Sequence, residues 1–127
     1  MFRLRVKDTF SAAHSLRYYQ GKCEAMHGHN FEVEVEVQGD VLEDKTEILF
    51  DFKKLKRLLK SVLEQLDHTC LNDLTYFQQV NPSSENIAKY IFDQLKTKLP
   101  DKVGLNYVMV AEGKNSMAFY EQRSCVL

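Results

Sequence analysis

Two segments with alternating side chains, residues 2–13 and 29–38, constrain the fold of this chain more than any other feature. Successive side chains of a strand point to opposite faces, so the alternation predicts two strands with one apolar and one polar face each. The polar face is cationic in the first strand and anionic in the second. The charged residues are Arg3, Arg5 and Lys7 in one strand and Glu32, Glu34 and Glu36 in the other. Facing strands of opposite charge predict an antiparallel pair.

The same charges predict the register of this pair. One cross-strand ion pair contributes only about 0.2–1 kcal/mol, but three acting together favour one alignment over its neighbours. The expected partners are Arg3 with Glu36, Arg5 with Glu34, Lys7 with Glu32, Phe10 with His29, and Ala12 with His27. In this alignment His14 lies diagonal to His27, and His29 shares the face of His27. A β-bulge in the first strand would shift the alignment by one residue.

Two helices are expected in the middle of the chain. Asp51 is a suitable N-cap for a helix over residues 52–65, whose leucines and valine recur at three- and four-residue intervals. A polar loop over residues 67–73 follows. The segment Asn81-Pro82-Ser83-Ser84-Glu85 has the composition of a second helix start, and Pro100 ends that helix.

Two further strands are expected near residues 103–112 and 117–123, joined by a turn at residues 113–116. The predicted order of elements is therefore ββααββ. Because the apolar stripes of two helices need a common surface to cover, we expect an α+β fold with both helices on one face of a four-stranded antiparallel sheet.

Length and composition indicate one globular domain over residues 1–127, with 44% hydrophobic and 28% charged residues. A net charge of −1 gives no support to nucleic-acid or membrane binding through bulk electrostatics. No apolar run approaches the roughly 20 residues that span a bilayer, and the N-terminus has no apolar segment of signal-peptide length. Cysteine is odd in number, at Cys23, Cys70 and Cys125, which argues against a disulfide framework. We therefore expect a cytoplasmic protein.

Three of the four histidines gather in the predicted strand pair, at His14, His27 and His29. Three imidazoles are the smallest set that holds a catalytic zinc ion with its fourth position open. Zinc is the default ion for such a set, although iron or cobalt uses the same ligands. Cys23, four residues before His27, leaves two kinds of site: a closed site with three histidines and the thiolate, or an open site beside a free thiol.

The loop around Cys23 is polar, which is unusual for a buried structural cysteine. Lys22 and a nearby cation would lower the pKa of this thiol below its ordinary value of about 8.5, which suits a base that works near neutral pH. Cys70 and Cys125 have no motif around them, and we do not expect either to be reactive.

Several other residues have both a functional and a purely structural interpretation. Asp67 and His68 form a carboxylate–imidazole pair, but they also suit a helix C-terminus, where the dipole favours a cation. Ser83 and Ser84 are good helix N-caps, a role that needs no ligand. Glu112 ends an apolar strand, and a glutamate at such a position is usually only solvated.

With these residues in place, the chain resembles the 6-pyruvoyl-tetrahydropterin synthase / 6-carboxy-tetrahydropterin synthase family over nearly its whole length. The element that combines cysteine, histidine, glycine and histidine is highly specific when an Asp-His pair accompanies it. The matching elements, in order, are Phe10-Ser-Ala-Ala-His14, Cys23-x-x-x-His27-Gly-His29, Asp51-Phe52-x-x-Leu55-Lys56, Leu66-Asp67-His68-x-x-Leu71-Asn72, Asn81-Pro82-Ser83-Ser84-Glu85-Asn86 and the strand that ends at Glu112.

The resemblance implies a T-fold (tunnelling fold), in which ββααββ subunits assemble into a barrel-like homohexamer of two trimers. Active sites of that fold lie between subunits. The charged face of the strand pair would then line the interior of the barrel. A small-molecule pterin triphosphate is the implied partner.

The resemblance also implies roles for individual residues. The implied ligands of one zinc ion per subunit are His14, His27 and His29. The implied catalytic residues are Cys23 as a base outside the zinc shell, with Asp67 and His68 as a proton relay. The implied substrate-binding residues are Glu112 as the anchor of the pterin ring, with Ser83, Ser84 and Glu85 nearby.

The implied reaction converts 7,8-dihydroneopterin triphosphate to 6-carboxy-5,6,7,8-tetrahydropterin with loss of acetaldehyde and triphosphate, on the route to queuosine. Formation of 6-pyruvoyl-tetrahydropterin is an alternative. Glu24 directly follows Cys23, as in a dual-motif group that also cleaves the side chain to 6-hydroxymethyl-dihydropterin for folate synthesis; a solvated loop glutamate is its structural alternative. A hypothesis of another class is a non-catalytic oligomeric module with a structural zinc ion that Cys23 completes.

Overall fold

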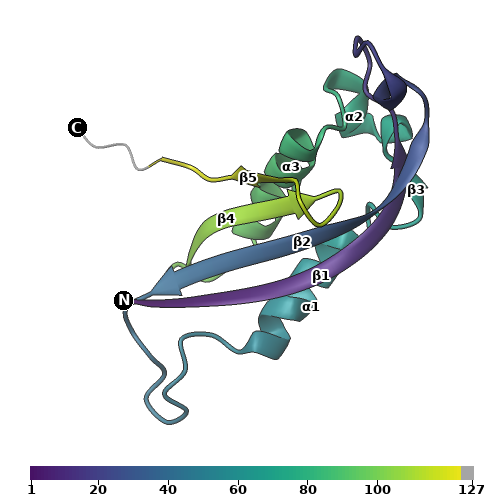
Figure 1. The fold of residues 1–127 in the computed structure, drawn as a ribbon. Helices are drawn as coiled ribbons and strands as arrows, with labels where there is room; N and C mark the ends of the chain where they lie inside the picture. Colours follow the sequence, from purple (N-terminus) through teal and green to yellow (C-terminus); the bar gives the residue numbers. More distant parts are fainter. Residues whose placement is uncertain (124–127) are drawn as a thin grey trace.

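The computed structural model describes residues 1–123, apart from the side chain of Cys23. Figure 1 shows a long twisted sheet with helices on one side of it. The elements are β1 (Phe2–His14), β2 (His27–Gly39), α1 (Phe52–Leu63), β3 (Thr69–Cys70), α2 (Thr75–Gln79), α3 (Ser84–Lys96), β4 (Gly104–Ala111) and β5 (Met117–Tyr120), with single 3₁₀ turns at Lys22–Glu24 and Leu71–Asp73. Among the described residues, no helix combines the length and the apolar character needed to cross a membrane.

The first two strands form the predicted antiparallel pair, but the predicted register is wrong by two residues. Arg5 lies opposite Glu36, and Lys7 lies opposite Glu34, in a continuous alignment along β1. A slip of two residues keeps every side chain on its predicted face, because the side-chain period of a strand is two. The predicted faces are therefore correct although the partners are not.

Packing explains why this register is adopted. Arg5 Nε lies 2.8 Å from a Glu36 oxygen, and Arg3 reaches the same carboxylate diagonally at 3.6 Å. Charge complementarity is thus satisfied in either alignment and does not distinguish them. The hydrophobic core distinguishes the two alignments, because Phe10 lies opposite Phe31 and the two buried rings stack with centroids 4.8 Å apart.

The sheet has five strands in the order β3-β1-β2-β4-β5, so the expectation of a four-stranded antiparallel sheet is only partly correct. The additional strand, β3, pairs in parallel with β1 at Ala12 and Ala13 and makes the sheet mixed. It lies in residues 67–73, predicted as a polar loop. The backbone N–H of His68 donates a hydrogen bond to the Ser11 carbonyl, 2.6 Å away, which brings this segment to the edge of the sheet.

Both predicted helices are present and cover the same face of the sheet (Figure 1). The predicted caps are confirmed, because an Asp51 oxygen accepts from the backbone N–H of Lys53 and the Ser83 hydroxyl accepts from that of Asn86. Helix α1 packs against β1, and α3 packs against β4 and β5. The short helix α2 between them was not predicted. The fully buried helical side chains include Leu55, Leu59, Val62, Ile87, Ile91 and Leu95.

The opposite face of the sheet carries the charged residues. Glu36 is only 4% exposed and accepts hydrogen bonds from Arg5 and Asn106. Burial opposes ionisation of Glu36, but the hydrogen bonds from Asn106 and Arg5 outweigh it and lower the pKa of this carboxyl. Burial and a hydrogen bond to Glu34 raise the pKa of Tyr107 to about 12. This face is a connected network of paired charges.

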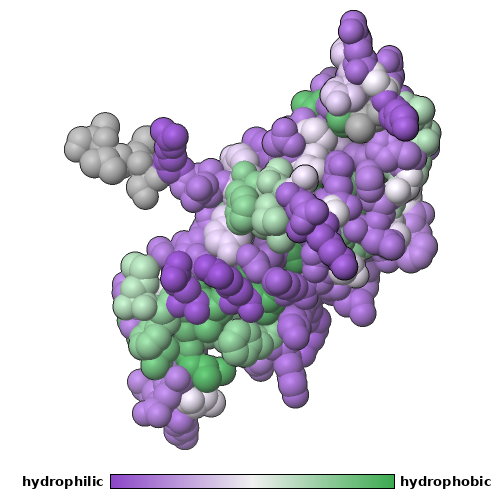
Figure 2. Space-filling view, viewed as in Figure 1, coloured by the Kyte–Doolittle hydropathy of each residue, from purple (hydrophilic) through white to green (hydrophobic). Residues whose placement is uncertain are grey.

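The two ends of β1 have different surroundings. Figure 2 shows an apolar surface patch at the end of the molecule that holds the N-terminus. Phe2, Ile48 and Phe52 are exposed there and line a groove of about 260 Å³. At the other end of β1, His14 is buried, with a relative exposure of 1%. The histidine cluster therefore lies at the end of the sheet remote from this patch.

Candidate functional site

The three predicted histidines meet where β1 ends and β2 begins. His14 is the last residue of β1 and lies directly opposite His27, the first residue of β2. His29 follows on the same face, opposite Ala12. The ring centroids are 4.6 to 5.3 Å apart, and one ligand atom from each ring lies within 4.8 Å of the others. These three side chains could hold a metal ion.

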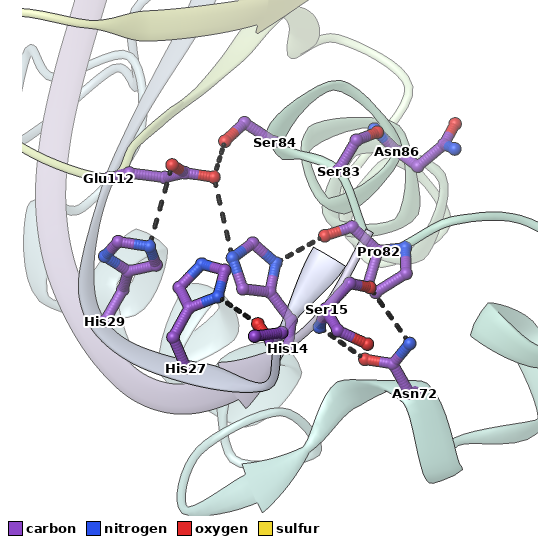
Figure 3. A network of polar contacts seen from close by, with 11 residues as sticks. His14, Ser15, His27, His29, Asn72, Pro82, Ser83, Ser84, Asn86 and Glu112 are labelled. Carbon is purple, nitrogen blue, oxygen red and sulfur yellow. Dashed lines mark hydrogen bonds and ion pairs between the residues drawn. The ribbon is translucent and has the colours of Figure 1, made fainter. Parts of the chain in front are cut away.

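Backbone carbonyls determine which nitrogen of two of these rings is free. His14 Nδ1 lies 2.7 Å from the carbonyl oxygen of Pro82, and His27 Nδ1 lies 2.7 Å from that of Ala25 (Figure 3). A carbonyl oxygen can only accept, so each Nδ1 carries the proton and donates. The Nε2 atom of each ring is left with an unshared electron pair. Such second contacts are typical of histidines that bind metals.

The environment of His14 also favours the neutral imidazole. Burial is the main cause of a pKa below the usual value for this histidine, although the hydrogen bond to Pro82 opposes it. Its Nε2 atom is buried and has no hydrogen-bond partner among residues 1–123. A buried nitrogen without a hydrogen-bond partner destabilises the folded protein unless a bound ion or water molecule interacts with it. A divalent ion such as zinc fits this donor set.

Glu112, directly after β4, lies beside the histidines. Its Oε1 atom is 3.7 Å from His14 Nε2, and its Oε2 atom is 3.7 Å from His29 Nε2. The Ser84 hydroxyl donates a hydrogen bond of 2.9 Å to Oε1 (Figure 3). A glutamate in this position of the sequence is usually only solvated, but here the tertiary structure places it between the histidines and the start of α3.

A cleft of about 280 Å³ adjoins this carboxylate, between the start of α3 and strand β5. Four of its lining residues were candidates from the sequence, namely Ser83, Ser84, Glu85 and Glu112. Their partners in the lining are Leu16, Ser116, Met117 and Ala118, which sequence analysis missed. Of these, Ser116 lies in the predicted turn at residues 113–116, and Met117 and Ala118 begin the strand predicted after it. The cleft offers apolar walls and a carboxylate, a combination suited to a flat polar ring.

Asp67 and His68 form a hydrogen-bonded pair away from this cleft. Asp67 Oδ2 lies 3.0 Å from His68 Nδ1, while Oδ1 accepts from the backbone N–H of Ser11 at 2.8 Å. The bond from Ser11 is the main cause of a lowered pKa for Asp67. His68 adopts a positive φ of 57°, and its side chain is 82% exposed. It lines a second cleft, of about 350 Å³, together with His29.

Cys23 and Glu24 lie in the 3₁₀ turn that precedes β2. The side chain of Cys23 is not among those described, so its role stays a prediction. Glu24 is exposed, and its backbone N–H donates to the carbonyl of Gly21. Cys70 Sγ lies 3.7 Å from Met26 Sδ, a contact that needs no catalytic explanation. Cys125 lies outside the described residues.

Comparison with known proteins is informative once this geometry is known. The family model described as 6-pyruvoyl tetrahydropterin synthase matches residues 3–123. A protein of Archaeoglobus fulgidus, provisionally named a 6-carboxy-5,6,7,8-tetrahydropterin synthase, is 43% identical over 115 residues, covering 89% of this chain and 90% of that protein. Dihydroneopterin monophosphate aldolase of Pyrococcus furiosus is 35% identical over 111 residues, covering 87% and 90%.

Solved structures agree with the fold. The structure of Caenorhabditis elegans 6-pyruvoyl tetrahydropterin synthase superposes with a TM-score of 0.84 and 29% sequence identity, and the match covers 96% of each chain.

Proposed function

Because this chain belongs to the 6-pyruvoyl tetrahydropterin synthase family, we propose that it is a zinc-dependent lyase acting on a pterin. The proposed reaction converts 7,8-dihydroneopterin triphosphate and one water molecule to 6-carboxy-5,6,7,8-tetrahydropterin, acetaldehyde and triphosphate, in queuosine and deazapurine synthesis. The observation that carries this proposal is the convergence of three imidazoles, two of them with Nε2 left free by a hydrogen bond at Nδ1, beside a cleft that ends in a carboxylate.

His14, His27 and His29 are the proposed zinc ligands. When bound, zinc would supply a Lewis acid that polarises hydroxyl groups of the substrate side chain. The chain's contribution is to fix the tautomer of His14 and His27 through the backbone carbonyls of Pro82 and Ala25, which leaves Nε2 of each ring available to the ion. Zinc rather than iron or cobalt is the proposal, because the side chain of the substrate supplies the electrons that reduce its own ring and the metal need not change oxidation state.

Glu112 is proposed to anchor the pterin ring. Its carboxylate lines the cleft and is 34% exposed, so a ligand in the cleft can reach it. The guanidine-like edge of a pterin presents two adjacent N–H donors, which match the two oxygens of one carboxylate. Ser84 orients that carboxylate, and Ser83 caps α3 next to it. Glu85 lies at the exposed margin of the same cleft.

Cys23, Asp67 and His68 are the proposed proton-transfer groups. Asp67 accepts from His68 Nδ1, which leaves Nε2 of the imidazole free to accept or donate a proton at the substrate. Cys23 is proposed as the base on the other side. Because the side chain of His68 is 82% exposed and its pair with Asp67 lies away from the cleft beside Glu112, we propose that this pair serves a metal site of a neighbouring subunit.

The edges of the sheet support a proposal of assembly into a homohexamer of two trimers. Strand β3 pairs with β1 only at Ala12 and Ala13, and Ser11 is bonded to Asp67 and His68, so in the described structure residues 2–10 of β1 have no strand partner on this edge. Strand β5 forms the opposite edge. Joining these edges between copies would satisfy both sets of backbone groups and enclose the charged face in a barrel.

Side-chain cleavage to 6-hydroxymethyl-7,8-dihydropterin is a second candidate activity, because Glu24 adjoins Cys23. The relative named dihydroneopterin monophosphate aldolase is consistent with it, since an aldolase breaks a carbon–carbon bond of the side chain. A carboxylate beside the thiol would provide a second base with a different reach. Formation of 6-pyruvoyl-tetrahydropterin remains an alternative product of the same site.

A product assay tests the proposal. Purified zinc-loaded protein is incubated with 7,8-dihydroneopterin triphosphate, and the pterins are separated and identified by mass spectrometry. We expect 6-carboxy-5,6,7,8-tetrahydropterin and acetaldehyde. An untouched substrate would refute the enzyme proposal, while a 6-pyruvoyl or 6-hydroxymethyl product would keep the enzyme class and replace the reaction.

Alkylation tests the alternative of a non-catalytic module with a structural zinc ion. If Cys23 completed a closed site, bound metal would protect its thiol from iodoacetamide. The enzyme proposal predicts rapid alkylation of Cys23 in the metal-loaded protein, read by peptide mass spectrometry.

A further inference from the structure

We infer that Glu112 is a fourth protein ligand of the metal ion in the substrate-free protein, held there by Ser84, and that the substrate displaces it. The inference rests on the proposed function, because it gives one carboxylate both a metal-binding and a pterin-binding position. It adds a ligand to the site and a reason for its selectivity. Neither follows from the three histidines alone.

The distances match a shared ion better than they match hydrogen bonds. In a tetrahedral zinc site with bonds of about 2.0–2.1 Å, neighbouring donor atoms are about 3.3 Å apart. Each carboxylate oxygen of Glu112 lies 3.7 Å from one histidine nitrogen, His14 Nε2 or His29 Nε2. This separation is too long for a hydrogen bond, and it is shorter than the 4.8 Å within which the ligand atoms of the three histidines lie. Glu112 approaches two of these three histidines, so it would join the ion from the side of His14 and His29.

The position of the proton on His14 also supports an ion shared with Glu112. His14 Nδ1 donates its proton to the Pro82 carbonyl, so Nε2 presents an electron pair toward Glu112. The carboxylate presents electron pairs as well. Two acceptors that face each other at a site where His14 is 1% exposed repel unless a cation lies between them. A metal ion satisfies both groups and also gives the buried Nε2 atom its missing partner.

Among residues 1–123, no basic side chain in an ion pair neutralises the negative charge of Glu112. Among the ion pairs of residues 1–123, the partners of Glu112 are His14 and His29, with no lysine or arginine. Three neutral imidazoles leave the full double charge on a divalent ion, so a nearby carboxylate is electrostatically favoured.

Ser84 determines where this carboxylate points. Its hydroxyl donates to Oε1, the oxygen that faces His14, and Ser84 is the first residue of a helix of 13 residues. Both the hydroxyl and the positive end of the helix dipole stabilise the anion in this position. Because Ser83 and not Ser84 caps the helix, the hydroxyl of Ser84 is available for this role.

Displacement of Glu112 would make binding selective. The same carboxylate lines the cleft of about 280 Å³, so after it leaves the ion it still faces a ligand there. A ligand that offers only hydroxyl groups to the ion would leave the carboxylate without a partner. A ligand with both hydroxyl groups and paired N–H donors compensates for both losses, which favours an intact pterin with its polyol side chain.

Metal affinity tests this inference without an activity assay. Zinc affinity is measured by competition with a chromophoric chelator, and the absorption spectrum of the cobalt(II) protein reports its ligands. We expect Glu112→Gln to weaken zinc binding about tenfold to a hundredfold and to change the cobalt spectrum. Ser84→Ala should weaken binding less, in the same direction. Glu85→Gln, at the margin of the same cleft, is the matched control and should bind zinc as the wild type does.

The outcome separates this inference from the proposed function. Zinc affinity of Glu112→Gln within twofold of the wild type, with an unchanged cobalt spectrum, would overturn the inference while the product assay on the wild type still judges the reaction. Thermal melting establishes that each variant is folded. If Glu112→Gln fails to fold, Ser84→Ala provides the test, because this variant keeps the helix cap. Zinc affinity and a cobalt spectrum equal to those of the wild type in Ser84→Ala would then contradict the inference.

Discussion

His14 Nδ1 donates a hydrogen bond of 2.7 Å to the carbonyl oxygen of Pro82, in the segment that leads into α3. The two residues are 68 positions apart in the chain, so this contact ties the end of β1 to the start of α3. It aims the buried Nε2 atom at the same point as the other two histidines. The start of α3, which carries Ser83 and Ser84, is thereby tied to a histidine of the proposed metal site.

Replacement of a histidine should separate metal binding from proton transfer. We expect His14→Ala to bind zinc much more weakly and to lose turnover, because the buried imidazole that approaches both Glu112 and the other two histidines is removed. His68→Ala is the matched control, since its side chain is 82% exposed and its ion-pair partner among residues 1–123 is Asp67, not one of the three clustered histidines. It should retain zinc and lose turnover by about 10²–10⁴-fold. Metal analysis of the purified proteins and the product assay measure both effects, and zinc loss in His68→Ala would contradict this division of roles.

Cys23→Ala should retain one zinc ion per subunit and lose turnover by about 10²–10⁴-fold, because a general base is removed and the ligands stay. Cys70→Ala is the control, since Cys70 contacts only Met26 among the hydrogen-bond partners of the described residues. It should keep zinc and turnover. Zinc content that falls in Cys23→Ala would instead support a closed site with a structural ion.

Glu24→Ala should change the product ratio. If Glu24 is a second base, the variant loses 6-hydroxymethyl-7,8-dihydropterin and keeps the product that depends on Cys23. The ratio is measured by chromatography after complete conversion of the substrate. Glu32→Ala, an exposed glutamate of β2, is a suitable control. The same product ratio in Glu24→Ala and the wild type would remove the dual activity.

The two neighbouring serines should have different effects on stability. The hydroxyl of Ser83 accepts from the backbone N–H of Asn86, so Ser83→Ala loses a helix cap and about 0.5–2 kcal/mol of unfolding free energy. Ser84→Ala keeps that cap and should change the stability of the metal-free protein by less than about 0.5 kcal/mol. Chemical denaturation of both variants measures the difference, and equal losses would argue against the assignment of the cap.

The metal-free protein should lose stability on mild acidification. Burial lowers the pKa of His14 in the folded state below the unfolded value of about 6.5, so the unfolded chain binds this proton more tightly. The contribution is complete above the unfolded pKa and is lost as the pH falls toward the folded pKa. One such group changes the unfolding free energy by at most about 1.4 kcal/mol per pH unit. Melting curves at pH 8 and pH 5 for the wild type and His14→Gln measure it; equal slopes would contradict the prediction.

Local patterns in the sequence determined the elements and their faces. Alternation along residues 2–13 and 29–38 predicted which side chains of β1 and β2 are buried, because a strand has only two faces. Asp51 and Ser83 predicted the helix starts, because capping depends on residues within one turn. The spacing of His27 and His29 likewise ensured that both rings share a face.

Tertiary structure alone decided the relationships between distant segments. The register of β1 and β2 follows from the stacking of Phe10 on Phe31 in the core, which charge pairing along the strands does not encode. The addition of β3 at the sheet edge and the approach of Glu112 to His14 also depend on long-range packing. Sequence therefore determined which side chains were available for a metal and a ligand. Folding determined which of them meet, because distances between residues far apart in the chain are set by how the whole core packs.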